Sequence, residues 1–199
     1  VMPDVEVKIG ENNEILLRGK TITTGYYKKP EATAAAIDRD GWFHTGDAGY
    51  LKDSHLYLTE RIKDLFKTSN GKYISPQALE TKLAIDRYID QIAVIADQRK
   101  FVSALIVPVY GLVKNYAKEK GLEYKDMADL LQHPKVQALF RARIDTLQQQ
   151  FAHYEQVKRF TLLSEPFSME RGELTNTLKL KRSVVAKNYK ELIDKMYEE

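Results

Sequence analysis

Three stretches of this sequence hold residues that could bind or react with a phosphate-bearing ligand. The first is Thr45-Gly46-Asp47, which follows an aromatic pair. Glycine permits a sharp backbone turn, so the stretch predicts a turn that presents one carboxylate. A carboxylate held there could accept two hydrogen bonds from a vicinal diol such as a ribose. Taken alone, Thr-Gly-Asp is more often an ordinary surface turn.

The second stretch begins at Arg61, fourteen residues after Asp47. Arg61 offers a rigid donor fork suited to ribose or phosphate oxygens, whereas Lys63 is a mobile point charge. In the loop that follows, Gly71 has no side chain and Lys72 adds a charge, so a ligand could approach the backbone closely. The structural alternative is a solvated loop, because the full phosphate-binding pattern G-x-x-x-x-G-K-[ST] is absent.

The third stretch contains Lys179, close to the end of the chain. A lysine there could neutralise charge that develops on a phosphate during a transfer reaction. The alternative is the basic first turn of an exposed helix, although cations are slightly unfavourable at that end of a helix. No metal site is predicted, since the four histidines are scattered and lack the spacing of zinc ligands.

The amino-acid composition is that of an ordinary globular protein. It has 199 residues, 43% of them hydrophobic and 30% charged, enough for one domain or one and a half. No apolar run approaches the roughly 18 to 20 residues that span a bilayer. The absence of cysteine excludes disulfides and thiolate metal sites, and fits a cytosolic protein. Because the chain opens at Val1 inside a strand-like pattern, we expect it to be a piece of a larger protein.

The pattern of apolar residues predicts an α+β fold with two parts. Residues 1 to about 60 are β-rich, with strands over 5–9 and 14–19, a short helix from Pro30 to about Ile37, and a hairpin that turns at 52–55. Charged residues at 61–64 interrupt this pattern and predict a short hinge.

The second predicted part, 65–199, is a mobile domain in which helices pack on a short sheet. Its first helix should begin at Ser75, a good cap before Pro76. The remaining expected elements are strands over 92–96, 102–109 and 157–163, extra helices within about 111–152 (111–120, 125–132 and 134–152), and one C-terminal helix through Val185, Tyr189 and Met196.

Four ordered motifs carry a family resemblance. Gly41 to Asp47 resembles the aromatic-x-T-G-D motif of the acyl-CoA synthetase, peptide-synthetase adenylation and luciferase superfamily. The three other motifs are the G-E-[LI]-x-x-x-G…G-Y-x-x-x-P-E-x-T pattern at 14–33 (with Asn13 in place of glycine), the hinge motif at 61–80, and the closing G-K-x-x-R motif at 179–182 (with Leu178 in place of glycine). Within this superfamily, the loop at 67–73, the extra helices and the ending at 174–182 are similar to long-chain fatty acid CoA ligases.

The resemblance implies a two-step reaction. ATP and a fatty carboxylate give an acyl adenylate and pyrophosphate, with Mg²⁺ offsetting the phosphate charge. The thiol of coenzyme A then displaces AMP, after the small domain has rotated about the hinge residue Lys63. By position, Asp47 would bind the ribose and Arg61 the nucleotide.

By the same resemblance, Lys179 would serve adenylation, with Lys181 as the fallback, while Gly71 and Lys72 would face the thioester step. The family's phosphate loop, acyl tunnel and adenine pocket precede this segment in a full-length enzyme. The chain alone is therefore predicted to be inactive and to hold no cofactor tightly, and its partner is the missing N-terminal domain. The expected location is the cytoplasm, with peripheral contact at the inner membrane surface as an option.

Two alternatives stay open. The same mechanism could act on a medium-chain, very-long-chain or aryl acid, because acyl specificity would lie mainly in the missing domain. A different kind of protein would be a stand-alone basic interaction module that binds nucleic acid through Lys179, Lys181, Arg182 and Lys187. Against this, the net charge of +3 is a small difference between 31 basic and 28 acidic residues, and no nucleic-acid motif is present.

Overall fold

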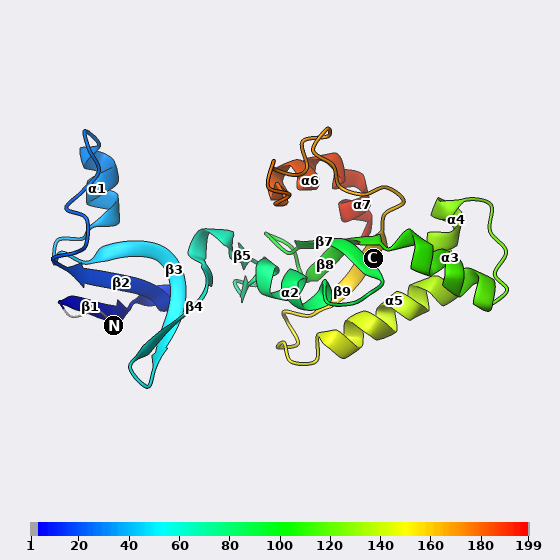
Figure 1. The fold of residues 1–199 in the computed structure, drawn as a ribbon, viewed down its shortest axis with the longest axis horizontal. Helices are drawn as coiled ribbons and strands as arrows, with labels where there is room; N and C mark the ends of the chain where they lie inside the picture. Colours follow the sequence, from blue (N-terminus) through cyan, green and yellow to red (C-terminus); the bar gives the residue numbers. More distant parts are fainter. Residues whose placement is uncertain (1–3, 199) are drawn as a thin grey trace. The chain divides into compact units, whose positions relative to one another are not determined.

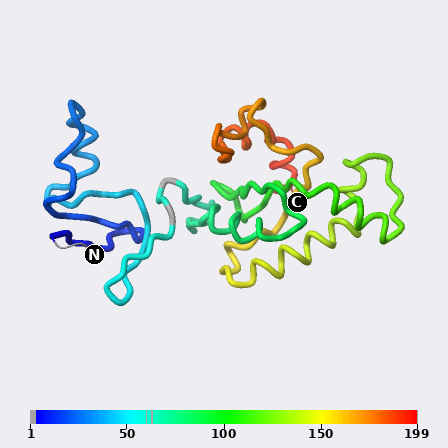
Figure 2. Tube along the Cα trace, in the orientation of Figure 1, coloured from blue at the N-terminus to red at the C-terminus, as the bar shows by residue number. Residues whose placement is uncertain are grey.

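The computed structural model describes residues 4–198, except for the side chains of Glu60 and Lys63. Helices and strands are mixed along the chain (Figure 1), which confirms the predicted α+β class. Figure 2 traces the same path from the N-terminus in blue to the C-terminus in red. The chain forms two compact units, the first ending at Leu65 and the second beginning at Phe66. The hinge residue expected from the sequence, Lys63, lies in a short 3-10 turn, η2 (Ile62–Asp64), and its side chain is outside the described residues.

The first unit is a four-stranded antiparallel sheet in the order β1-β2-β3-β4, with one helix, α1 (Pro30–Ala36). Its strands are β1 (Val5–Ile9), β2 (Glu14–Gly19), β3 (Phe43–Lys52) and β4 (His55–Arg61). The predicted hairpin is confirmed, since Lys52 pairs with His55. Between them Asp53 and Ser54 have positive φ angles of 48° and 63°, as the tight hairpin turns favoured by right-twisted strands require.

The second unit is built on a three-stranded sheet in the order β7-β8-β9. β7 (Ile89–Ile95) and β8 (Val102–Pro108) are antiparallel, and β9 (Val157–Leu162) runs parallel to β8. A small pair, β5 (Phe66–Lys67) and β6 (Tyr73–Ile74), opens the unit. The helices are α2 (Pro76–Leu83), α3 (Tyr110–Glu119), α4 (Met127–Gln132), α5 (Pro134–Leu147), α6 (Arg182–Asn188) and α7 (Lys190–Lys195).

Both faces of this sheet are covered, as Figure 1 shows for α2 and α5 on one side and α6 and α7 on the other. Side chains alternate along β8 because successive residues of a strand point to opposite faces. Ala104 and Ile106 join the core formed with α2, α3, α4 and α5. Leu105 and Val107 join the core formed with α6 and α7. Leu174 and Leu180, which lie on either side of Lys179 in the sequence, also pack against this second core.

Two sequence predictions of helix extent were wrong. The helix expected over 134–152 ends at Leu147, where the Gln148 side chain accepts a hydrogen bond from the Val157 N–H at 2.8 Å and ties the helix end to β9. The single C-terminal helix is two short helices, because Tyr189 between them leaves helical geometry (φ −105°, ψ 19°). Among residues 4–198, no helix is long and apolar enough to cross a membrane.

Candidate functional site

Asp47 and Arg61, the two residues proposed to bind nucleotide, lie opposite each other on β3 and β4. The Arg61 Nε lies 3.1 Å from an Asp47 carboxylate oxygen. The Arg61 side chain is 72% exposed and that of Asp47 28%. An ion pair this exposed contributes only about 0–1 kcal/mol to stability. The pairing therefore leaves the guanidinium available to a ligand that approaches the same carboxylate.

The tight turn predicted at Thr45-Gly46-Asp47 was wrong, because all three residues lie within β3, where its pairing with β2 is irregular. The Thr45 hydroxyl donates to the Ile15 carbonyl at 2.7 Å and accepts from the Asp47 N–H at 3.1 Å. Gly46 has a φ of +70°, a backbone conformation that residues other than glycine rarely adopt. Thr45 and Gly46 together shape the irregular part of β3 that carries Asp47.

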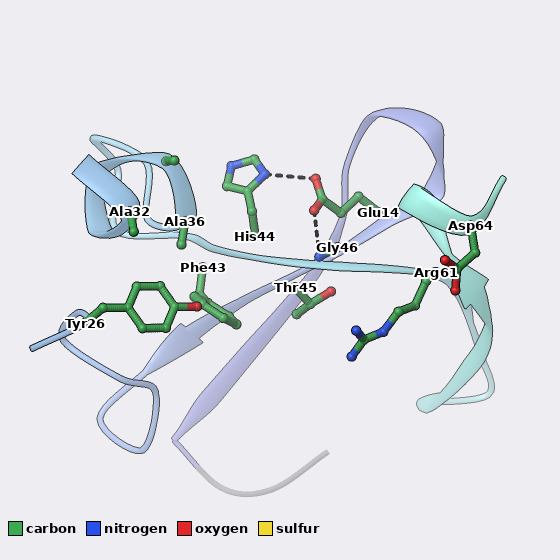
Figure 3. Close-up of a pocket in the computed structure, with 11 residues that line it drawn as sticks. Glu14, Tyr26, Ala32, Ala36, Phe43, His44, Thr45, Gly46, Arg61 and Asp64 are labelled. Atoms are coloured by element: carbon green, nitrogen blue, oxygen red, sulfur yellow. Dashed lines mark hydrogen bonds and ion pairs between the residues drawn. The ribbon is translucent and has the colours of Figure 1, made fainter. Parts of the chain in front are cut away.

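Glu14 and His44 complete this site, although sequence reasoning gave neither of them a role. One carboxylate oxygen of Glu14 accepts from the Gly46 N–H at 2.9 Å, and the other lies 2.9 Å from His44 Nδ1 (Figure 3). His44 Nε2 lies 3.6 Å from an Asp38 oxygen. Hydrogen bonds from the Trp42 and Asp40 N–H groups lower the pKa of Asp38. The only sequence signal for Glu14 was its position in the G-E-[LI] motif at 14–33.

A cavity of about 770 Å³ opens beside this part of β3. Figure 3 shows Arg61 and Asp64 toward one end and Tyr26 and Ala32 toward the other, with Thr45 between them. Ligand pockets usually measure about 300–1,000 Å³, so the volume suits a nucleoside or part of a nucleotide. The lining combines an apolar wall with a few polar groups, which is the usual composition of such a site.

In the second unit, Gly71 and Lys72 lie in a tight loop closed by Thr68. The Thr68 N–H donates to the Lys72 carbonyl at 2.9 Å, and the Lys72 N–H donates to the Thr68 hydroxyl at 3.1 Å. Gly71 has a φ of +75°, and a Cβ placed there would meet no atom within 4 Å. The Lys72 ammonium lies 5.6 Å from the centre of the Tyr154 ring. The loop is thus rigid and open at Gly71.

Lys179 lies in a short hairpin, Leu174–Leu180, which we call the Lys179 hairpin. Leu174 and Leu180 form an isolated bridge, and the Thr175 N–H donates to the Lys179 carbonyl at 2.8 Å. The alternative that placed Lys179 in the first turn of a helix was wrong, since α6 begins at Arg182. The side chain of Lys179 is exposed. The hairpin therefore combines a hydrogen-bonded backbone with an ammonium that is open to solvent.

Leu178 supports the motif alignment at Lys179. It has a φ of +60° and is 67% exposed. The left-handed region costs a non-glycine residue roughly 1–2 kcal/mol, so this is a position that favours glycine. Glycine is the residue that the closing motif carries immediately before its lysine. The left-handed backbone at Leu178 is therefore one that the glycine of the motif would adopt without strain.

The predicted site residues thus form separate groups. Asp47 and Arg61 meet within the first unit, whereas Gly71 and Lys72 share one loop of the second unit and Lys179 lies in another segment. Among the side chains that the structure describes, no three His, Cys, Asp or Glu residues come together in a way that could hold a metal ion.

Residues 63–199 match the family described as the AMP-binding enzyme C-terminal domain, and the chain belongs to this family of adenylate-forming enzymes. It is 36% identical over 192 residues to long chain acyl-CoA synthetase 6, peroxisomal, of Arabidopsis thaliana, covering 94% of this chain and 27% of the relative. It is also 32% identical over 201 residues to the long-chain-fatty-acid--CoA ligase FadD15 of Mycobacterium tuberculosis, covering 98% and 33%.

Solved structures give the same family. The adenylation domain of a carboxylate reductase from Mycobacterium chelonae superposes with a TM-score of 0.70 at 26% identity, over 92% of this chain and 27% of that one. O-succinylbenzoate coenzyme A synthetase of Bacillus subtilis, at 22% identity and a TM-score of 0.57, shares the fold. The chain spans about a quarter to a third of the length of the curated relatives it matches.

Proposed function

We propose that this chain is the C-terminal part of an AMP-forming long-chain fatty acid–CoA ligase. It would comprise the last strands of the large domain, a hinge at 61–64, and a mobile domain from residue 65. The observation that carries the proposal is the pairing of Asp47 with Arg61 across β3 and β4, within the Thr-Gly-Asp segment of β3. Support comes from the names of the curated relatives, which are long-chain acyl-CoA synthetases and ligases.

In the first half-reaction, a carboxylate oxygen of the fatty acid would bond to the α-phosphorus of ATP. The bond from that phosphorus to the bridging oxygen breaks, and pyrophosphate leaves with the electron pair. In the second, the thiol sulfur of coenzyme A bonds to the acyl carbon. The bond from the acyl carbon to the AMP oxygen breaks, and the thiol proton is released.

Each candidate residue has a role that its setting allows. Asp47 would accept hydrogen bonds from both ribose hydroxyls, and Arg61 would contact the nucleotide from the adjacent strand. Lys179 would offset charge on the phosphate during adenylation. Rotation about Lys63 would then present the loop of Gly71 and Lys72 to the thioester step.

The reaction's metal ion is not assigned to residues of this chain. ATP-dependent enzymes commonly use Mg²⁺, which one or two carboxylates and the substrate phosphates hold. The side chains that the structure describes contain no cluster of metal ligands. The proposed partners are the preceding domain of the same protein and the substrates, and a peripheral membrane contact of the whole enzyme stays part of the proposal.

The test is an assay of the full-length protein with ATP and coenzyme A against a panel of acids. The proposal expects AMP, pyrophosphate and acyl-CoA in equal amounts with palmitate, and slower turnover with octanoate, a C24 acid or benzoate. Equal or faster turnover of the aryl or shorter acid would replace the long-chain assignment with one of the sibling specificities. No AMP with any acid would contradict the ligase assignment itself.

A further inference from the structure

Glu173 is a buried carboxylate that the mechanism above does not use. Its side chain is 1% exposed, whereas those of Arg171 and Glu165, with which it shares an ion-pair network, are 38% and 74% exposed. An ionised group is rarely buried this fully unless it is paired and hydrogen-bonded. The groups that donate hydrogen bonds to this carboxylate therefore show which chain segments it connects.

Three neighbours donate to the Glu173 carboxylate. Arg171 Nε donates to it at 3.1 Å, and the Ser168 N–H donates at 3.0 Å from the loop before it. Asn188 Nδ2, near the end of α6, donates at 3.1 Å. Burial opposes ionisation, but these hydrogen bonds outweigh it and lower the pKa of the Glu173 carboxyl. The carboxylate thus joins the loop before the Lys179 hairpin to the helix after it.

Glu173 directly precedes the Lys179 hairpin, and its backbone pairs with the residue that follows the hairpin. Its carbonyl accepts from the Lys181 N–H at 2.7 Å, one pair outside the bridge between Leu174 and Leu180. Inside that bridge, the Lys179 N–H donates to the Thr175 hydroxyl at 3.0 Å. The two strands of the hairpin that carries Lys179 therefore meet at Glu173, whose side chain is anchored to α6.

We propose that Glu173 is a positioning residue for Lys179, holding the Lys179 hairpin in the orientation that adenylation needs. The inference rests on the proposed function, because it takes Lys179 as the adenylation lysine. A glutamine at 173 has one acceptor oxygen where the carboxylate has two, and its amide would face donors. The hairpin should then lose its fixed direction while the sheet and helices of the unit stay formed.

The test uses the full-length protein and measures the two half-reactions separately. Glu173→Gln should slow formation of palmitoyl-adenylate about 10- to 100-fold, the scale expected for misplacement by about 1 Å. The conversion of supplied palmitoyl-adenylate and coenzyme A into palmitoyl-CoA should stay near the unmutated rate, because it does not depend on Lys179. Glu165→Gln, which removes an exposed carboxylate from the same arginine, is the matched control and should leave both rates unchanged.

Amide hydrogen exchange over 174–182 gives a readout without catalysis. It should quicken in Glu173→Gln and stay unchanged in Glu165→Gln. Parallel loss of both half-reactions, or normal adenylation with normal exchange, would overturn the inference. If Glu173→Gln does not fold, Asn188→Ala, which removes one donor to the same carboxylate from an exposed position, decides by the same measurements. Failure of the unmutated enzyme to form any palmitoyl-adenylate would instead reject the proposed function, and the exchange result would still decide whether Glu173 fixes the hairpin.

Discussion

Arg182 donates to both carboxylate oxygens of Glu80, at 2.5 and 2.6 Å. The two residues are 102 positions apart, and each is the last residue of a motif that resembles the adenylate-forming superfamily. One oxygen of Glu80 also accepts from the Val94 N–H at 2.8 Å. This pair therefore connects α2, β7 and the start of α6, directly after the Lys179 hairpin.

Breaking this pair should destabilise the second unit. The side chains of Glu80 and Arg182 are 14% and 29% exposed, so removing one partner leaves a poorly hydrated charge. Glu80→Ala should lower the free energy of unfolding by about 2–4 kcal/mol, somewhat below the cost of breaking a fully buried pair. Urea unfolding of Glu80→Ala, of Arg182→Ala and of the double variant measures the coupling free energy between the two side chains.

Lys187→Ala is the control, because Lys187 is an exposed charge on the same helix. It should change the free energy of unfolding by no more than about 0.5 kcal/mol. A coupling free energy near zero between Glu80 and Arg182 would show that the pair contributes nothing to the unit.

Asp47→Asn should raise the KM for ATP in the full-length enzyme. Asparagine has one acceptor oxygen, so at least one ribose hydrogen bond is lost, worth about 1.5–3 kcal/mol or roughly 10- to 100-fold. Initial rates over a range of ATP concentrations measure this. Asp53→Asn is the matched control, since Asp53 lies at an exposed hairpin tip with a φ that asparagine also adopts. Equal KM values for the two variants would remove Asp47 from the nucleotide site.

Much of this architecture follows from local sequence patterns. Alternating apolar residues predicted β1, and Ser75 before Pro76 predicted the start of α2, where the Ser75 hydroxyl accepts from the Ala78 N–H. These features depend on residues within a few positions of each other. The end of α5 was missed because it depends on a side chain, Gln148, that bonds a distant strand.

In the candidate site, too, motifs predicted some residues, whereas contacts between distant residues could not be predicted. Motif order pointed to Asp47 and Arg61, and strand pairing places them opposite each other. The contact of Glu14 with His44 could not be predicted, because the two residues are 30 positions apart and meet only through the register of β2 and β3. The anchoring of Glu173 by Asn188 depends likewise on how α6 folds back.

Leu178→Gly should stabilise the second unit. A left-handed conformation costs a leucine about 1–2 kcal/mol, whereas the added freedom of glycine in the unfolded chain costs about 0.5–1 kcal/mol. The net gain should be about 0.5 kcal/mol, since little packing is lost from a side chain that is 67% exposed. Thermal unfolding should rank glycine above leucine and leucine above valine. The reverse order would show that Leu178 is not strained.

Lys179 and Lys181 can be separated by paired substitutions. Both are exposed, but only Lys179 directly follows the left-handed residue that the motif alignment requires. Lys179→Ala should slow palmitoyl-adenylate formation about 10²–10³-fold, the effect of losing one group that stabilises transition-state charge. Lys181→Ala should keep nearly the unmutated rate. The opposite result would assign adenylation to Lys181.

The decisive experiment measures pyrophosphate release with ATP, palmitate and coenzyme A, side by side for the full-length protein and for the 199-residue chain alone. In the proposed enzyme, this chain supplies half of the nucleotide site and the adenylation lysine, and the preceding domain supplies the rest of the active site. We therefore expect steady turnover by the full-length protein and none by the chain alone. Sustained pyrophosphate release by the isolated chain would show that this division of the active site is wrong.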